Sequence, residues 1–168
     1  MHRKTFLAAI IMLVLLGICS SFLSAEEYRY QNMEWGISLD GIVENLVCDN
    51  FYCYGTNIAV LNQYILERKA DLVYQCTPKT AKLYRVRIRW IFPPDCEYVI
   101  KAHLDKIFNT MDHQYGPPDY FDPLKNLAKW LDEETGTYIS VEPEDNYFAI
   151  KLIYGNLSLE KQAQAEKF

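Results

Sequence analysis

The chain has 168 residues, half of them hydrophobic, and a formal net charge of −5 at pH 7. An acidic balance of this kind argues against general binding to nucleic acid or to anionic lipid, because both need clustered positive charge. The length corresponds to a single domain with one hydrophobic core.

Residues 1–25 have the pattern of a secretory signal peptide. Basic residues at 2–4 precede an apolar stretch at 6–18, and small residues at 24–25 predict cleavage after Ala25. Two alternatives use the same segment: an uncleaved membrane anchor, which would need about 20 apolar residues, and a lipoprotein signal in which Cys19 carries the lipid. We expect an exported protein of the periplasm or cell envelope, with no membrane span after cleavage.

Cleavage after Ala25 would leave 15 basic and 22 acidic residues, which gives the remaining chain a charge of −7.

Taken in chain order, the first predicted element is a short helix that begins after Ser38, a suitable N-cap residue. Its apolar residues recur at helical spacing and share one face: they are Leu39, Ile42, Val43, Leu46 and Val47.

Three strands are predicted next, at residues 57–66, 70–77 and 82–92. The third has the clearest alternation. We expect Tyr84, Val86, Ile88, Trp90 and Phe92 to face the core, and Leu83, Arg85, Arg87, Arg89 and Ile91 to face away from it.

A second helix is predicted from Asp95, as its N-cap, to Tyr115, with Gly116 and two prolines as the stop. Its buried stripe would comprise Ile100, Leu104, Ile107, Phe108, Met111 and Tyr115. A loop at 119–123 then leads to three more strands, which we place at 127–132, 137–141 and 147–154.

These elements predict an α+β fold. The single domain would span 26–156 and consist of two units, 33–92 and 93–156, each a helix followed by a three-stranded meander. The two meanders would form one antiparallel sheet with both helices on one face. We expect residues 157–168 to form a polar tail, either a frayed helix or a disordered segment, that adds nothing to the core.

Three short motifs carry a resemblance to a known set of proteins. Trp35-Gly36-Ile37-Ser38 opening a helix, the strand Lys82-Leu83-Tyr84-Arg85-Val86, and the stop Tyr115-Gly116-Pro117 resemble small exported bacterial proteins of unknown function. The layout over 33–154 is similar to that of the small lipoprotein of the outer-membrane barrel assembly machine and, in tandem form, to β-lactamase inhibitor protein. Both act by binding another protein, so the resemblance implies binding and transfers no functional residue.

Four cysteines follow the predicted signal, at Cys48, Cys53, Cys76 and Cys96. Their spacing does not suit zinc, and an exported protein favours disulfides. A hairpin turning at Pro78 would hold Cys76 more than about 30 Å from Cys96, whereas a disulfide needs Cα atoms within about 7 Å. We therefore expect a bridge among the first three, with Cys53–Cys76 slightly ahead of Cys48–Cys53, and no partner for Cys96.

Arg85, Arg87 and Arg89 would line one face of a strand at intervals of about 6.6 Å. Such a stripe could bind a carboxylate, a phosphate or an acidic protein surface. It could equally be a solvated face with acidic partners across the strands. The stripe is the candidate binding site that this sequence offers.

The other chemistry-bearing residues suit structural roles. His103 and His113 lie about 15 Å apart along one helix and cannot share a metal. The acidic turns at 132–134 and 142–145 would lie at opposite ends of their strands and cannot form one calcium site. No serine occupies a nucleophile motif, so an enzyme would have to use carboxylates such as Asp119 and Asp122.

The function expected from these features is that of an exported binding or adaptor protein, whose partner is a protein of the envelope. The alternative is a small-ligand carrier with a shallow apolar cleft on the sheet. An enzyme ranks third, and we predict no catalytic residue, metal or cofactor.

Overall fold

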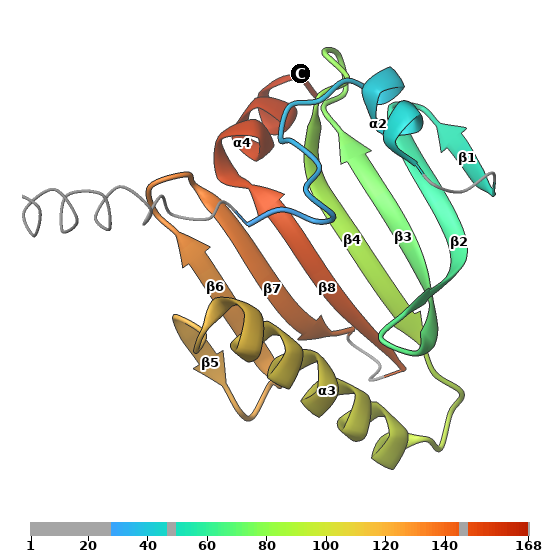
Figure 1. Ribbon diagram of the computed structural model, residues 1–168, viewed down its shortest axis with the longest axis vertical. Coiled ribbons are helices and arrows are strands. Elements are labelled where there is room, and N and C mark those ends of the chain that lie inside the picture. The colour runs from blue at the N-terminus through green and yellow to red at the C-terminus, as the bar shows by residue number, and fades with distance from the viewer. Residues whose placement is uncertain (1–27, 47–49, 145–147, 168) are drawn as a thin grey trace, which may run out of the picture.

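The computed structural model describes residues 28–46, 50–144 and 148–167. Over these residues the fold is α+β, with three helices and one antiparallel sheet of eight strands (Figure 1). The predicted signal peptide, with Cys19 and the cleavage site at Ala25, lies outside the described residues, as does Cys48. No helix among the described residues is long and apolar enough to span a membrane.

The helices are α2 (Leu39–Asn45), α3 (Glu97–Tyr115) and α4 (Leu157–Ala165). The strands are β1 (Phe51–Tyr54), β2 (Asn57–Ile65), β3 (Arg68–Cys76), β4 (Leu83–Ile91), β5 (Tyr120–Asp122), β6 (Leu127–Asp132), β7 (Thr137–Pro143) and β8 (Ala149–Asn156). Their spatial order is β1-β2-β3-β4-β8-β7-β6-β5, so β4 and β8 are neighbours at the centre of the sheet.

Six of the eight strands match the predicted ones, and the two edge strands do not. We expected three strands after each of the first two helices, whereas α2 and α3 are each followed by four. The extra strands, β1 and β5, have four and three residues. Strands this short show no readable alternation, and short edge strands protect a sheet from pairing with other chains.

The N-cap predicted for α2 is confirmed, because the Ser38 hydroxyl accepts a hydrogen bond from the Gly41 N–H at 3.2 Å. The helix is shorter than its apolar pattern, since Leu46 already has extended backbone angles. Its fully buried residue is Ile42, which packs with Ile58 and Val60 in the core.

The alternation predicted for β4 is correct over most of the strand. Val86, Ile88 and Trp90 are buried, and the three arginines point to the opposite face. At the start of β4 the prediction is wrong, because Leu83 is buried and Tyr84 is half-buried. The cause is a register shift in the β3–β4 pairing between Gln75 and Cys76, since a bulge exchanges the two faces of a strand.

Helix α3 begins one residue later than predicted, at Glu97. Asp95 has a φ of 67° and does not cap the helix, which has Cys96 at its N-cap position. The predicted stop is confirmed, since Gly116 has a φ of 79° and its N–H donates to the Asp112 carbonyl at 2.8 Å. The residues that α3 buries against the sheet are Ile100, His103, Leu104, Ile107 and Met111.

Both histidines have the structural positions expected of them. His103 is 6% exposed, and its ring centroid lies 5.0 Å from that of Trp90 and 5.7 Å from that of Phe92. Its buried Nε2 has no hydrogen-bond partner among the described residues. His113 is exposed in the last turn of α3.

The C-terminal segment forms α4, so of the two expected alternatives the helix is correct, and the prediction that the segment adds nothing to the core is wrong. The Asn156 side chain caps α4 by accepting the Leu159 N–H at 3.0 Å, and Ala163 is buried. Beyond the helix, Glu166 accepts the N–H groups of Lys79 and Thr80 at 2.7 and 3.2 Å. Although burial opposes ionisation, these donors lower the pKa of Glu166 to about 2.

We predict that His103 makes the stability depend on pH. Burial, and then the charges of Arg68 and Lys106, lower its pKa from 6.5 to about 4. The unfolded chain therefore binds this proton more tightly, and the stability given by the neutral ring is complete above about pH 6.5 and is lost as the pH falls towards 4. The loss can reach about 3 kcal/mol.

Urea unfolding at a series of pH values checks this prediction. His103→Leu should flatten the profile between pH 6.5 and 4, whereas His113→Gln, which changes an exposed histidine of the same helix, should leave it unchanged. An unaltered profile in His103→Leu would show that another group causes the acid sensitivity.

Candidate functional site

The two faces of the sheet differ in what covers them. Helices α2 and α3 lie on one face (Figure 1), where Ile42 and Ile107 join the core. Among the described residues no helix covers the middle of the opposite face, which we call the bare face. Helix α4 lies at its end, beside β4 and β8.

The strand register sets one row of side chains across all eight strands of the bare face. We call it the central row; from β1 to β5 it comprises Tyr52, Ala59, Val73, Arg87, Ile153, Ser140, Lys129 and Tyr120. The tyrosines at its two ends are half exposed, at 49% and 50%. The residues of the row on either side of Arg87 are small or β-branched and buried; they are Ala59, Val73, Ile153 and Ser140.

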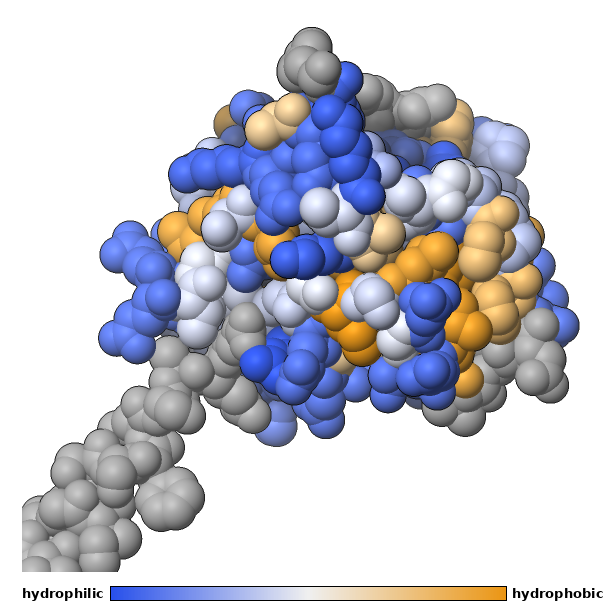
Figure 2. Space-filling view, turned by 90° about the horizontal axis from the view of Figure 1, so that it is seen from above, coloured by the Kyte–Doolittle hydropathy of each residue, from blue (hydrophilic) through white to orange (hydrophobic). Residues whose placement is uncertain are grey.

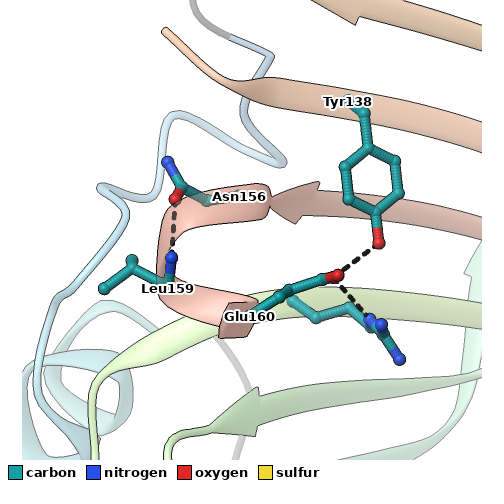
Figure 3. Close-up of polar contacts among 5 residues, drawn as sticks. Tyr138, Asn156, Leu159 and Glu160 are labelled. Atoms are coloured by element: carbon teal, nitrogen blue, oxygen red, sulfur yellow. Dashed lines mark hydrogen bonds and ion pairs between the residues drawn. The ribbon is translucent and has the colours of Figure 1, made fainter. Parts of the chain in front are cut away.

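At one end of the bare face, the carboxylate of Glu160 on α4 contacts two side chains of the sheet. Glu160 accepts hydrogen bonds from the Tyr138 hydroxyl at 2.5 Å and from Arg85 Nε at 3.0 Å (Figure 3). The ring of Tyr138 lies across Gly155, where an added Cβ would be 2.5 Å from the ring. Burial and the bond to Glu160 raise the pKa of Tyr138. Arg85 is therefore already paired within the chain.

A second carboxylate pairs Arg89. Glu144, which follows β7, accepts from Arg89 Nε at 2.9 Å and from Arg89 Nη2 at 2.6 Å. Lys151 on β8 lies 3.0 Å from the other oxygen of Glu144. Burial favours the neutral acid, but these donors outweigh it and lower the pKa of Glu144. The acidic turn at 142–145 therefore supplies a structural ion pair.

Arg87, between the two paired arginines, has no hydrogen-bond or ion-pair partner among the described residues, and its buried Nε is unsatisfied. Its neighbours across the strands are Val73 and Ile153, each 9% exposed. On the same face Gln75 has a buried Oε1 that also lacks a partner. The structure thus places the three predicted arginines together and distinguishes Arg87 from the other two.

A shallow groove of about 520 Å³ lies on the bare face between β4 and β5. It takes in the central-row residues Ile153, Ser140, Lys129 and Tyr120. Its other lining residues include Arg85, Tyr138 and Leu157. The groove therefore begins beside the arginines and ends at the exposed Tyr120.

A larger hollow of about 750 Å³ lies on the helix-covered face, between the segment at 30–34, the end of α2, and strands β2 and β3. Figure 2 views the end of the molecule where α2 and α4 lie, and it shows hydrophobic side chains reaching the surface between hydrophilic ones. None of the predicted site residues, neither the three arginines of β4 nor the cysteines, lines this hollow.

The part of the chain that the structure describes contains no disulfide, so the predicted Cys53–Cys76 bridge is wrong, and Cys48 lies outside the described residues. Cys53, Cys76 and Cys96 have free thiols. Cys53 is in β1 and Cys76 in β3, with β2 between them, so their backbones are about 10 Å apart and cannot be bridged. The prediction failed because β1 was not recognised as a strand. Burial raises the pKa of the Cys76 thiol to about 12.

The carboxylates considered for catalysis hold turns and strands. Asp119 accepts the Leu131 N–H at 2.7 Å, and Asp122 accepts the N–H groups of Leu124 and Lys125 at 3.0 and 3.2 Å. Within the part of the chain that the structure describes, no group of three or more His, Cys, Asp or Glu residues could hold a metal.

Sequence reasoning missed Glu160, Tyr138 and Lys129. The sequence does contain a signal for the helix that carries Glu160, because Asn156 followed by an acidic residue in the first turn is typical of a helix N-terminus. The roles of Tyr138 and Lys129 depend on which strands are neighbours, and no local pattern encodes that.

Comparison with known proteins gives no match for this chain, whether with family models, curated proteins or solved structures. The resemblance to exported bacterial proteins therefore stays a prediction.

We predict that Glu160→Gln destabilises the protein by about 1.5 to 3 kcal/mol, because charged hydrogen bonds to two partly buried donors are lost. Denaturant unfolding measures the change, with Glu134→Gln in an exposed turn as the control. Tyr138→Phe should cost less, and the double variant should cost less than the sum of the two, since both remove the same bond. Additive losses would contradict the shared contact.

Proposed function

We propose that this protein is an exported binding or adaptor protein of the periplasm or cell envelope, and that it binds another protein through the bare face. The observation that carries the proposal is the composition of that face. It combines exposed aromatic side chains with an arginine that has no partner among the described residues. Tyrosine and arginine are the residue types enriched at protein interfaces and at their energetic centres.

The exposed aromatics lie on both sides of the arginines. Tyr52 and Tyr54 on β1, with ring centroids 5.8 Å apart, are 49% and 42% exposed, and Tyr64 on β2 is 73% exposed. On the other side, Tyr120 and Leu131 border the groove. Exposed apolar side chains grouped on one face mark interaction sites more often than scattered ones do.

Backbone pairing and ion pairs constrain the bare face. Its side chains are held by a continuous ladder of backbone hydrogen bonds and by the ion pairs of Glu160 and Glu144. A preorganised surface loses little conformational entropy when a partner binds, so more of the contact energy appears as affinity. This supports recognition of a folded or extended protein surface by the sheet.

We also infer that the fold arises from two units, 33–92 and 93–156. Helices α2 and α3 each precede four antiparallel strands, and the last strand of each set lies at the centre of the sheet. This supports the expected repeat, with four strands in each unit in place of three.

Site-specific crosslinking in the native host tests the proposal. A photoreactive phenylalanine analogue at position 52 or at position 120 should give an adduct with the same protein, because both lie at the ends of the central row. The analogue at position 98 is the matched control, since Tyr98 is 85% exposed but belongs to α3. Adducts from position 98 alone, or from none of the three, would contradict binding through the bare face.

The groove favours small-ligand carriage as a second candidate function. Its volume of about 520 Å³ falls in the range of small-molecule sites. Native mass spectrometry of protein purified from the host should then show a bound compound that is lost when Ser140→Phe fills the groove. A measured mass equal to that of the polypeptide alone would contradict the proposal that the protein carries a small ligand.

A further inference from the structure

The arginines of β4 show an incomplete pattern of charge pairing. Arg85 and Arg89 each receive a carboxylate from a distant part of the chain, Glu160 for the first and Glu144 for the second. The residue between them, Arg87, receives none from the described residues. A guanidinium with a buried, unbonded N–H costs free energy, typically about 1–3 kcal/mol for a neutral group and more for a charged one.

The carboxylates on the neighbouring strands of the bare face belong to other rows. Asp71 is paired in register with Arg89 and accepts the Asn62 N–H at 3.3 Å, while Glu142 is paired in register with Lys151. Within the central row every residue is either uncharged or basic. Its two charges are those of Arg87 and Lys129, and both are positive.

We propose that Arg87 and Lys129 bind two carboxylates of the partner, presented by an extended acidic segment that lies along the central row. This proposal rests on the proposed function and names the chemistry of its partner. Strands β4 and β6 are three positions apart in the sheet, so the Cα atoms of Arg87 and Lys129 are separated by about 14 Å. In an extended segment, residues four apart span about that distance and project from the same side.

The surroundings of Arg87 strengthen such a contact. Val73 and Ile153 flank it, so a bound carboxylate would be shielded from water at that point, and a charge-assisted pair is stronger where water is excluded. The groove continues from Ile153 past Lys129 to Tyr120 and gives the segment a path across β8, β7, β6 and β5. It is also lined by two carboxylates outside the central row, Asp119, which accepts the Leu131 N–H, and Glu142, which is paired in register with Lys151. Because Nε of Arg87 is buried, a carboxylate arriving from solvent would bind the two Nη groups of the guanidinium, which can donate two hydrogen bonds.

The pairing pattern also predicts how Arg87 affects stability. A residue retained for binding stabilises the free protein little or not at all. Arg87→Thr should therefore be at least as stable as the parent protein in urea unfolding, whereas Arg85→Thr should be destabilised, because it leaves Glu160 and Tyr138 without their cation. A marked loss of stability in Arg87→Thr would mean that the chain itself supplies its partner, and would overturn the proposal.

Binding is tested with a short synthetic peptide of alternating valine and polar residues that carries two glutamates four residues apart. At low salt, NMR titration should shift the Arg87 Nε–Hε signal. Arg87→Thr and Lys129→Gln should each weaken binding at least about tenfold. Lys101→Gln, on the exposed side of α3, is the matched control and should leave the affinity unchanged.

Two control peptides make the test specific. Replacement of both glutamates by glutamine should abolish binding, and glutamates three residues apart should bind about as weakly as a single glutamate, because the two then face opposite sides. Equal binding of all peptides, or no shift of the Arg87 signal with the first peptide, would overturn the proposal.

The crosslinked partner separates this proposal from the proposed function. If the adducts at positions 52 and 120 form equally well in Arg87→Thr and Lys129→Gln, binding through the bare face holds and the acidic-segment proposal is wrong. If the adducts disappear in both variants and persist in Lys101→Gln, both proposals are supported.

Discussion

The pairing of β4 with β8 is the contact on which the rest of the structure depends. Seven residue pairs, from Arg85–Gly155 to Ile91–Ala149, join the first four strands to the last four. Because side chains alternate along a strand, this register decides the content of both faces at once. It places Ile88 beside Leu152 under the helices, and Arg87 beside Ile153 on the bare face. A slip by one residue would bury the arginines and expose the core.

The two faces are stabilised by different interactions. The helix-covered face is held by apolar burial, with Trp90, Trp130 and Ile150 almost fully buried. The bare face has two ion pairs whose members are far apart in sequence, 75 residues for Arg85 and Glu160 and 55 for Arg89 and Glu144. These pairs tie the last helix and the β7–β8 connection to the first half of the chain. Their geometry leaves Arg87 as the arginine of β4 to which the described chain brings no carboxylate.

Long and strongly periodic segments could be predicted well, and short or irregular ones could not. Strand β4 and helix α3 have clear hydrophobic periods, so their faces were predicted correctly apart from the ends. Strands β1 and β5 are too short to show a period, and the bulge beside Gln75 reverses the alternation at Leu83. Helix α4 was expected only as one of two alternatives, because its sequence is polar and it depends on the Asn156 cap and on contacts with distant residues.

The sequence by itself determined which side chains share a face, because the alternation along one strand is a local property of the backbone. It was sufficient to put Arg85, Arg87 and Arg89 on one face of a strand. The tertiary structure alone decided which arginine lacks a partner, where Lys129 lies relative to Arg87, and that Cys53 and Cys76 are kept apart by β2. Each of these depends on the order of strands in the sheet, and that order results from pairing between segments distant in sequence, to which no local pattern is sensitive.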